Sequence, residues 1–171
     1  MTLADRARRV KLAAFDVDGV MTDGTLYIGP TGEAFKPFHV LDGHGVKLLK
    51  REGIECAIVS GRSSEAVTWR AKEIGIPTVI QGCEDKVAAL TRIAQAAGHT
   101  LDECAYMGDD LPDVELLKRV ALSGSVPNAV AEVKAIVHYV TAAPGGKGAV
   151  REFCEMLIRL RRQPAGANAV E

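Results

Sequence analysis

Residues 10–22 read VKLAAFDVDGVMT, a mostly apolar run that leads into two carboxylates. The run at 10–15 is predicted to form a buried strand, and Asp16 and Asp18 follow at its C-terminal end. A buried carboxylate without a partner is costly, and two like charges this close raise each other's pKa unless a cation lies between them. This pattern predicts that Asp16 and Asp18 hold a metal ion and attack a phosphate group or relay protons to it.

The rest of the chain alternates predicted strands with predicted helices. Further strands are predicted at 54–59, 77–80, 104–107, 120–122 and 137–140. Helices are predicted at 42–51, 63–75, 84–97, 112–118, 128–134 and 150–160. Strands that alternate with helices over short loops imply an α/β protein with a doubly wound, Rossmann-like parallel sheet. We expect one domain over residues 1–171, with a flexible C-terminal tail at about 163–171.

Residues 24–40 are predicted to form a protruding β-hairpin. The turn Gly29-Pro30-Thr31-Gly32 separates two β-rich segments, which is typical of a hairpin. Four apolar side chains of this segment have no obvious partner within it: Leu26, Ile28, Phe35 and Phe38. Because a lone hairpin is only marginally stable in water, we expect it to pack on something else, such as another subunit.

The composition argues against several classes of function. The 171 residues are 47% hydrophobic and 25% charged, with a formal net charge of −1. This charge does not suggest nucleic-acid binding, which usually needs a basic stripe. No apolar run approaches the roughly 20 residues that span a bilayer, so a membrane role is not expected. The N-terminus lacks the apolar stretch of a signal peptide and the four cysteines are scattered, so we expect reduced thiols and a cytoplasmic location.

Polar side chains recur where the predicted strands end. Asp16 and Asp18 follow the first strand, Ser60 follows the second, and Asp109 and Asp110 follow the fourth. In open α/β sheets, ligands bind at the carboxyl ends of the strands, near the point where strand order reverses. Each motif is weak by itself. Together they predict one crevice with several carboxylates and a hydroxyl group.

These groups match what hydrolysis of a phosphate monoester requires. The substrate is an anion, so a hard cation and fixed donors must neutralise its charge. Mg²⁺ suits this task because it prefers one or two carboxylates plus substrate oxygens. A carboxylate can then attack phosphorus and form an aspartyl-phosphate, while a second acid protonates the leaving alkoxide. A lysine would hold the nucleophile and the phosphoryl oxygens together. The sequence offers a candidate for each of these parts.

Four motifs stand in the order and rough spacing of the haloacid dehalogenase superfamily: Asp16-Val17-Asp18-Gly19-Val20, Ser60-Gly61-Arg62, Lys86 and Gly108-Asp109-Asp110. The chain therefore resembles that superfamily. More narrowly, it is similar to the phosphatases of 3-deoxy-D-manno-octulosonate 8-phosphate, which lack a large cap domain. This similarity covers roughly residues 10–160 and includes the stretches at 21–24, 32–38, 41–45 and 145–152.

The resemblance implies a Mg²⁺ site built mainly from aspartates. Asp16 would be the nucleophile and a ligand of the ion. Asp18 would be the general acid/base and would bind the ion through its backbone carbonyl. Asp109 would complete the site, and Asp110 and Asp113 would support these ligands from outside it. For Asp110 a second role stays open, as the cap of the helix that follows.

The resemblance also suggests which groups hold the substrate. Ser60, beside Gly61, would hydrogen-bond the phosphoryl group, and Lys86 would bridge that group to the nucleophile. Arg62 and Arg70 would suit the carboxylate of an acidic sugar. For both arginines, a plain surface role stays open.

The activity implied by the resemblance is Mg²⁺-dependent hydrolysis of 3-deoxy-D-manno-octulosonate 8-phosphate, in lipopolysaccharide synthesis. The subfamily is tetrameric, so a neighbouring subunit would complete the active site and the hairpin would form the subunit interface. One alternative is a phosphatase of a nine-carbon, sialic-type sugar 9-phosphate, whose relatives tend to carry glutamate at the position of Arg62. Another is a non-catalytic oligomerisation module, which would be expected to have lost motif residues that this chain keeps.

Overall fold

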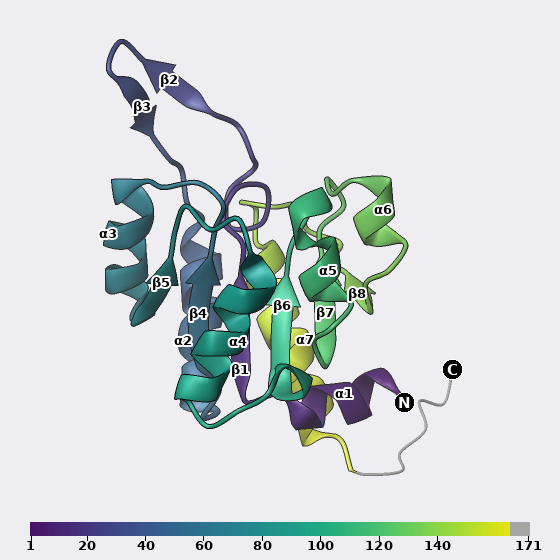
Figure 1. Cartoon of the computed structure of the whole chain (residues 1–171). Coiled ribbons are helices and arrows are strands. Elements are labelled where there is room, and N and C mark those ends of the chain that lie inside the picture. Colours follow the sequence, from purple (N-terminus) through teal and green to yellow (C-terminus); the bar gives the residue numbers. More distant parts are fainter. Residues whose placement is uncertain (165–171) are drawn as a thin grey trace.

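A computed structural model describes residues 1–164, and the remainder of the expected tail, 165–171, lies outside the described residues. At the centre is a six-stranded sheet in which every strand is parallel to its neighbours (Figure 1). The strands are β1 (Leu12–Phe15), β4 (Glu55–Val59), β5 (Thr78–Ile80), β6 (Cys104–Met107), β7 (Leu122–Ser125) and β8 (Tyr139–Val140). They stand in the order β5-β4-β1-β6-β7-β8.

The direction of winding reverses beside β1. From β1 the chain moves outward to β4 and β5, then crosses to the other side of β1 and continues through β6, β7 and β8. In a doubly wound sheet, the crevice at the carboxyl ends of the strands at such a reversal is the usual ligand site. The prediction of a doubly wound parallel α/β sheet is confirmed.

Helices cover both faces of this sheet. They are α1 (Leu3–Arg9), α2 (Val40–Arg51), α3 (Glu65–Ile74), α4 (Lys86–Ala96), α5 (Val114–Leu117), α6 (Ala131–Lys134) and α7 (Ala149–Arg162), with 3₁₀ turns η1 (Leu101–Glu103) and η2 (Leu111–Asp113). In Figure 1, α2 and α7 pack on each other behind the sheet, and α4 and α5 lie in front of it. No described helix is long and apolar enough to cross a membrane.

The central strands anchor the loops that carry the site. All four residues of β1 and all four of β6 are buried. Phe15, Tyr106 and Phe153 are among the largest side chains with almost no exposure. Because burial of apolar surface stabilises the fold by roughly 25 cal/mol per Å², the ends of these two strands are firmly held.

Strand β7 begins and ends later than the segment 120–122 expected from the sequence. The observed strand includes Ser123, Gly124 and Ser125, which have low strand propensity, so the local pattern does not reveal it. A Cβ added at Gly124 would overlap the ring of Phe153 on α7. The strand therefore depends on the close approach of a helix that is distant in the chain.

The start of α2 also differs from the predicted 42–51. The helix begins at Val40, with His39 as its N-cap. Asp42 is instead buried, and its carboxylate accepts a hydrogen bond from the backbone N–H of Arg151 at 2.9 Å, in the first turn of α7. The short helix α1, which begins with a capping box, was not predicted.

The predicted hairpin is present as β2 (Tyr27–Gly29) and β3 (Gly32–Phe35), an antiparallel pair that projects beyond the sheet in Figure 1. Tyr27 and Phe35 stack with their ring centroids 4.5 Å apart. Ile28 and Phe35 are 65% and 58% exposed, so the hairpin presents apolar surface that residues 1–164 do not cover. Apart from this hairpin, the described residues contain no large cap over the sheet.

Candidate active site

The loop after β1 forms a tight turn that is closed by hydrogen bonds within its own backbone. The carbonyl of Val17 accepts hydrogen bonds from the N–H groups of Met21 and Thr22, at 2.9 and 3.0 Å. Gly19 has a φ of +88°, and an added Cβ would overlap the carboxylate of Asp109. The turn therefore requires glycine twice over, for its backbone conformation and for the close approach of a neighbouring aspartate.

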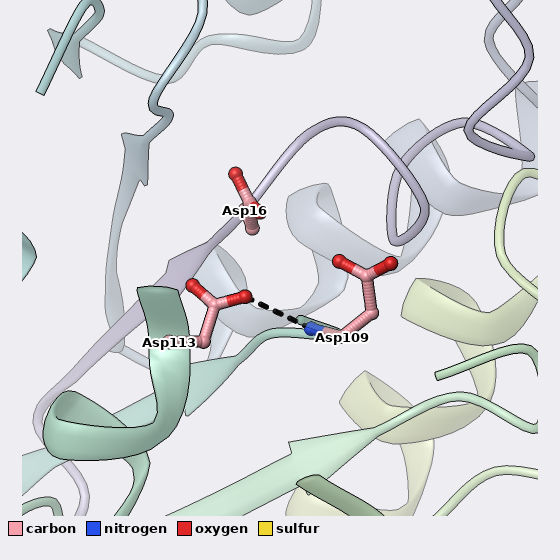
Figure 2. Close-up of side chains that lie close together, drawn as sticks. All are labelled: Asp16, Asp109 and Asp113. Atoms are coloured by element: carbon pink, nitrogen blue, oxygen red, sulfur yellow. Dashed lines mark hydrogen bonds between the residues drawn. The ribbon is translucent and has the colours of Figure 1, made fainter. Parts of the chain in front are cut away.

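Three aspartates from distant parts of the chain meet beside this turn. Asp16 follows β1, Asp109 follows β6, and Asp113 ends η2 (Figure 2). One carboxylate oxygen of each lies within 4.8 Å of the others. Asp113 is fully buried, and its Oδ2 accepts the backbone N–H of Asp109 at 3.0 Å. The arrangement concentrates negative charge at the carboxyl edge of the sheet.

Lys86 is the cation that the structure places against this cluster. Its Nζ lies 3.0 Å from Asp16 Oδ2 and 2.6 Å from Asp113 Oδ1. Burial by itself would lower the pKa of Lys86, but the charges of Asp16 and Asp113 outweigh burial and raise that pKa. The lysine is therefore charged, and it stands where it can contact both Asp16 and an anion in the cavity.

The cluster fits a divalent cation. Burial, and then the charge of Asp113, raises the pKa of Asp16 to about 6; burial, and then the charge of Asp16, raises the pKa of Asp109 to about 7. Asp109 Oδ1 is buried and has no hydrogen-bond partner within residues 1–164. Buried carboxylates in this state favour a hard cation, and all the donor atoms are the oxygens that Mg²⁺ prefers.

A cavity of about 280 Å³ opens over the cluster. It is lined by Asp16, Asp18, Gly24, Ser60, Gly61, Arg62, Lys86, Asp109, Asp110, Pro112 and Asp113. A larger hollow of about 800 Å³ lies beside α2 and α7, but none of the clustered carboxylates lines it. We take the smaller cavity as the candidate active site because convergent chemical groups, and not volume, decide reactivity.

Asp18 also lines this cavity. Its carboxylate is paired with Lys36, and Arg62 Nε lies 3.6 Å from Asp18 Oδ2. Ser60 is buried at the end of β4, where its backbone N–H bonds to the carbonyl of Ile80 at 2.9 Å. The structure thus brings the expected acid/base, the hydroxyl group and Arg62 to one cavity.

Arg70 is the one proposed substrate contact that does not line the cavity. Its guanidinium pairs with Glu73 at 2.6 Å and donates to the carbonyl of His39 at 3.0 Å. An added Cβ at Gly43 would lie within 3.1 Å of the Arg70 guanidinium carbon, so the side chain lies against α2. Arg70 follows Arg62 by about two helical turns in the sequence, and that spacing suggested a shared site. It could not show that the side chain of Arg70, on α3, lies against α2 and outside the cavity.

The two aspartates after Asp109 have different surroundings, although the sequence analysis gave them the same supporting role. Asp110 is exposed and caps the following turn, with Oδ1 accepting the N–H of Leu111 at 2.8 Å. Asp113 is fully buried and offers an oxygen to the cluster itself. Asp113 is therefore part of the carboxylate cluster, and not outside it as predicted.

Comparisons with known proteins agree with this geometry. The family profile of haloacid dehalogenase-like hydrolases matches residues 79–152. A 3-deoxy-D-manno-octulosonate 8-phosphate phosphatase of Yersinia pestis is 38% identical over 165 residues, which are 96% of this chain and 88% of that protein. The chain belongs to this phosphatase family.

Solved structures of the phosphatase family share the fold. A 3-deoxy-D-manno-octulosonate 8-phosphate phosphatase from Moraxella catarrhalis, in complex with a magnesium ion, a phosphate ion and a KDO molecule, is 43% identical with a TM-score of 0.90. The match covers 92% of this chain and 91% of that one. A cobalt-bound phosphatase from Haemophilus influenzae is 37% identical with a TM-score of 0.88, covering 91% of each chain.

Sequence reasoning missed two buried groups in this member of the phosphatase family. The hydroxyl of Tyr106 donates to Asp113 Oδ1 at 2.7 Å, and Lys86 Nζ lies 3.3 Å from the same hydroxyl. The strand pattern predicts that Tyr106 is buried, but not where its hydroxyl points. Lys36 pairs with Asp18, and its only signal was its place in the stretch at 32–38.

A third missed residue, Asn128, joins the loop before α7 to the loop after β1. Its Nδ2 donates to the carbonyl of Gly19 at 2.9 Å, and its Oδ1 accepts the N–H of Gly145 at 2.8 Å. The N–H of Gly146 donates directly to the carbonyl of Val20 at 3.1 Å. The glycine-rich stretch at 145–148 therefore supports the turn that carries Asp16.

Proposed function

We propose that this protein is a Mg²⁺-dependent phosphatase that hydrolyses 3-deoxy-D-manno-octulosonate 8-phosphate to the free sugar acid and phosphate. The observation that carries this proposal is the buried cluster of Asp16, Asp109 and Asp113 with Lys86 beneath a small polar cavity. Membership of the phosphatase family supports the same reaction and the same class of substrate.

The carboxylates of Asp16 and Asp109, with the backbone carbonyl of Asp18, would hold Mg²⁺, and Asp113 lies close enough to support them. When bound, the ion neutralises charge on the phosphoryl oxygens and on these carboxylates. The unpartnered Oδ1 of Asp109 supports this assignment, because a cation would satisfy it.

Asp16 is the proposed nucleophile. Its Oδ1 accepts the N–H of Val17 at 2.8 Å, and its Oδ2 lies 3.0 Å from Lys86 Nζ, so the carboxylate is held in place. One oxygen attacks phosphorus and forms the aspartyl-phosphate, while the ester oxygen leaves with a proton from Asp18. A water molecule, deprotonated by Asp18, then attacks the phosphoryl group and frees both phosphate and Asp16.

The remaining cavity residues bind the substrate in this proposal. Ser60 and the backbone at Gly61 hold phosphoryl oxygens together with Lys86. Arg62 would receive the carboxylate of the sugar acid, and its half-exposed position in the cavity wall supports this role. Arg70 is not included in this set within its own chain.

Replacing the nucleophile tests the reaction directly. Asp16→Asn keeps the size of the side chain but removes the attacking oxygen's charge, so we expect phosphate release to fall by about 10³-fold or more. Asp102→Asn, at an exposed aspartate paired with Arg9, is the matched control and keeps full activity. Near-normal turnover by folded Asp16→Asn would refute the assignment.

Two alternatives are separated by further measurements. If the substrate were a nine-carbon sugar 9-phosphate, kcat/KM on that compound would equal or exceed kcat/KM on the eight-carbon 8-phosphate. If the chain were a non-catalytic module, the wild-type protein would release no phosphate from either compound in the presence of Mg²⁺. We expect activity, with a preference for the eight-carbon acid, because Arg62 stands in the cavity where relatives acting on nine-carbon substrates tend to carry glutamate.

We further propose a homotetramer in which a neighbouring subunit closes the active site. The exposed apolar hairpin supports this, since the described residues leave Leu26, Ile28 and Phe35 uncovered. We also propose that the protein acts in the cytoplasm, on the route to lipopolysaccharide, in keeping with a phosphorylated sugar as its substrate.

A further inference from the structure

Lys36 is a buried lysine that the proposed mechanism does not use. Its side chain is only 3% exposed, and its Nζ pairs with Asp18 Oδ1 and lies 3.2 Å from Glu33 Oε2. We propose that Lys36 is a positioning residue that holds the carboxylate of Asp18 in the orientation required for proton transfer to the leaving group. This inference rests on the proposed function of Asp18 as the acid/base.

The burial of Lys36 needs an explanation, because removing an ammonium group from water is costly unless opposite charges and hydrogen bonds compensate. Asp18 and Glu33 supply that compensation. Glu33 is itself held by the hydroxyl of Ser64, just before α3. The lysine is therefore held through Glu33, whose carboxylate is in turn fixed by the loop after β4.

Asp18 depends on this lysine for its orientation. Within residues 1–164, Lys36 is the only group that donates a hydrogen bond to the Asp18 carboxylate. Lys36 donates to Asp18 Oδ1, whereas Asp18 Oδ2 lies 3.6 Å from Nε of the cavity-lining Arg62. Without Lys36, rotation of the carboxylate would be restrained only by the long contact to Arg62, whose side chain is 49% exposed.

Lys36 acts through Asp18 and not on the substrate. Asp18 and Arg62 line the cavity, but Lys36 does not. Its position is set by the hairpin, since it directly follows β3. A displacement of about 1 Å in a reacting group can reduce the rate by about 10²-fold, so a residue behind the acid can matter without touching the substrate.

The competing interpretation is that Lys36 only stabilises the hairpin. Two substrates whose leaving groups differ in their need for a proton distinguish the two roles. Formation of the aspartyl-phosphate from a sugar phosphate expels an alkoxide, which needs the proton of Asp18. The same step from p-nitrophenyl phosphate expels a nitrophenolate, which departs as an anion without a proton. Loss of acid catalysis slows the first reaction and spares the second, whereas loss of structure slows both.

The experiment compares wild type, Lys36→Met and Lys36→Gln in single-turnover reactions with Mg²⁺ and excess enzyme. We expect Lys36→Met to slow release of the sugar by about 10²-fold and release of nitrophenolate by less than about 3-fold. Lys36→Gln keeps a hydrogen-bond donor for Asp18, so its rate of sugar release should fall less than that of Lys36→Met. Lys118→Met, at an exposed lysine paired with Glu115, is the matched control and should change neither rate.

Equal slowing of both substrates by Lys36→Met and Lys36→Gln, or an unchanged rate of sugar release, would overturn the proposal. Thermal unfolding and oligomeric state are measured on the same samples, so that a misfolded variant is recognised and Lys36→Gln then carries the comparison. Failure of the proposed function gives a different result. In that case the wild-type protein releases no sugar at all, and Asp16→Asn leaves the nitrophenolate reaction unchanged.

Discussion

Gly19 shows how one missing side chain decides the geometry of the site. Its φ of +88° is easy only for glycine, and a Cβ there would overlap the carboxylate of Asp109. The turn after β1 can therefore bring Asp16 and Asp109 to one point only if this position is glycine. A residue that carries no side chain is thus necessary for the carboxylates of Asp16 and Asp109 to converge.

Gly19→Ala should lose Mg²⁺ affinity as well as stability. The positive φ costs about 1 kcal/mol for alanine, and displacement of Asp109 adds to that cost. Gly98→Ala is the matched control, since Gly98 also has a positive φ, of +77°, with no atom within 4 Å of an added Cβ. Calorimetric Mg²⁺ titration should show weaker binding for Gly19→Ala alone; equal binding by both variants would contradict the overlap.

The raised pKa values of Asp16, about 6, and Asp109, about 7, predict how stability depends on pH. In the folded protein these groups hold protons that the unfolded chain has released above about pH 4, so metal-free stability falls as pH rises through about 6 and 7. Mg²⁺ replaces those protons and should restore the stability.

Thermal unfolding with and without Mg²⁺, at about pH 5 and about pH 8, measures this effect. We expect Mg²⁺ to raise Tm by about 5 °C or more at the higher pH and by much less at the lower one. Asp109→Asn has one titrating group fewer and should show a smaller pH dependence without metal. A larger Mg²⁺ effect at low pH than at high pH would be inconsistent with these pKa values.

At the scale of elements, the site depends on how α7 meets the sheet. Phe153 on α7 packs directly over Gly124 in β7, and Asp42 near the start of α2 accepts the N–H of Arg151. These contacts hold the first turn of α7, and with it the loop at 145–148 that bonds to the turn after β1. Helix packing on one face of the sheet therefore supports a loop at its edge.

Gly124→Ala should destabilise the protein because the added methyl group overlaps the ring of Phe153. Overpacking of this kind typically costs about 1–3 kcal/mol. The double variant Gly124→Ala, Phe153→Leu makes room for the methyl group and should cost less than the sum of the two single changes. Urea unfolding of the four proteins measures the coupling, and strict additivity would show that the two side chains do not compete for space.

At the scale of the whole molecule, the hairpin is where residues 1–164 leave apolar side chains such as Ile28 and Phe35 uncovered. The hairpin projects beyond the sheet in Figure 1. Lys36, the residue that directly follows β3, pairs with Asp18. An assembly that covers the apolar residues of the hairpin would therefore also restrain the residue behind the proposed acid. Assembly and catalysis would then share one element.

Ile28→Asp should break the proposed tetramer. The side chain is 65% exposed in the single chain, and a charge there cannot be buried against another subunit without a large cost. Val140→Asp, on the exposed edge of β8, is the control and should leave the assembly intact. Light scattering at micromolar concentration should give a tetramer for wild type and a smaller species for Ile28→Asp. A wild-type monomer would rule out the interface.

The sequence by itself determined the kind of fold and the chemistry at the strand ends. Apolar runs followed by Asp16, Ser60 and Asp109 are local patterns, and in a parallel sheet all such ends lie on one edge. That reasoning predicted the doubly wound sheet, the hairpin and most residues of the cavity. It placed this strand at 120–122 instead of Leu122–Ser125, because Ser123 and Gly124 have low strand propensity and Gly124 is covered by the distant Phe153.

Only the tertiary structure decided which side chains point into the site. It placed Asp113 in the carboxylate cluster and left Asp110 as an exposed cap, although both follow the same strand. It turned Arg70 toward α2, and it brought Lys36 back to Asp18 along the hairpin. The physical reason is that periodicity tells which element a residue occupies, whereas side-chain direction depends on contacts between segments far apart in the chain.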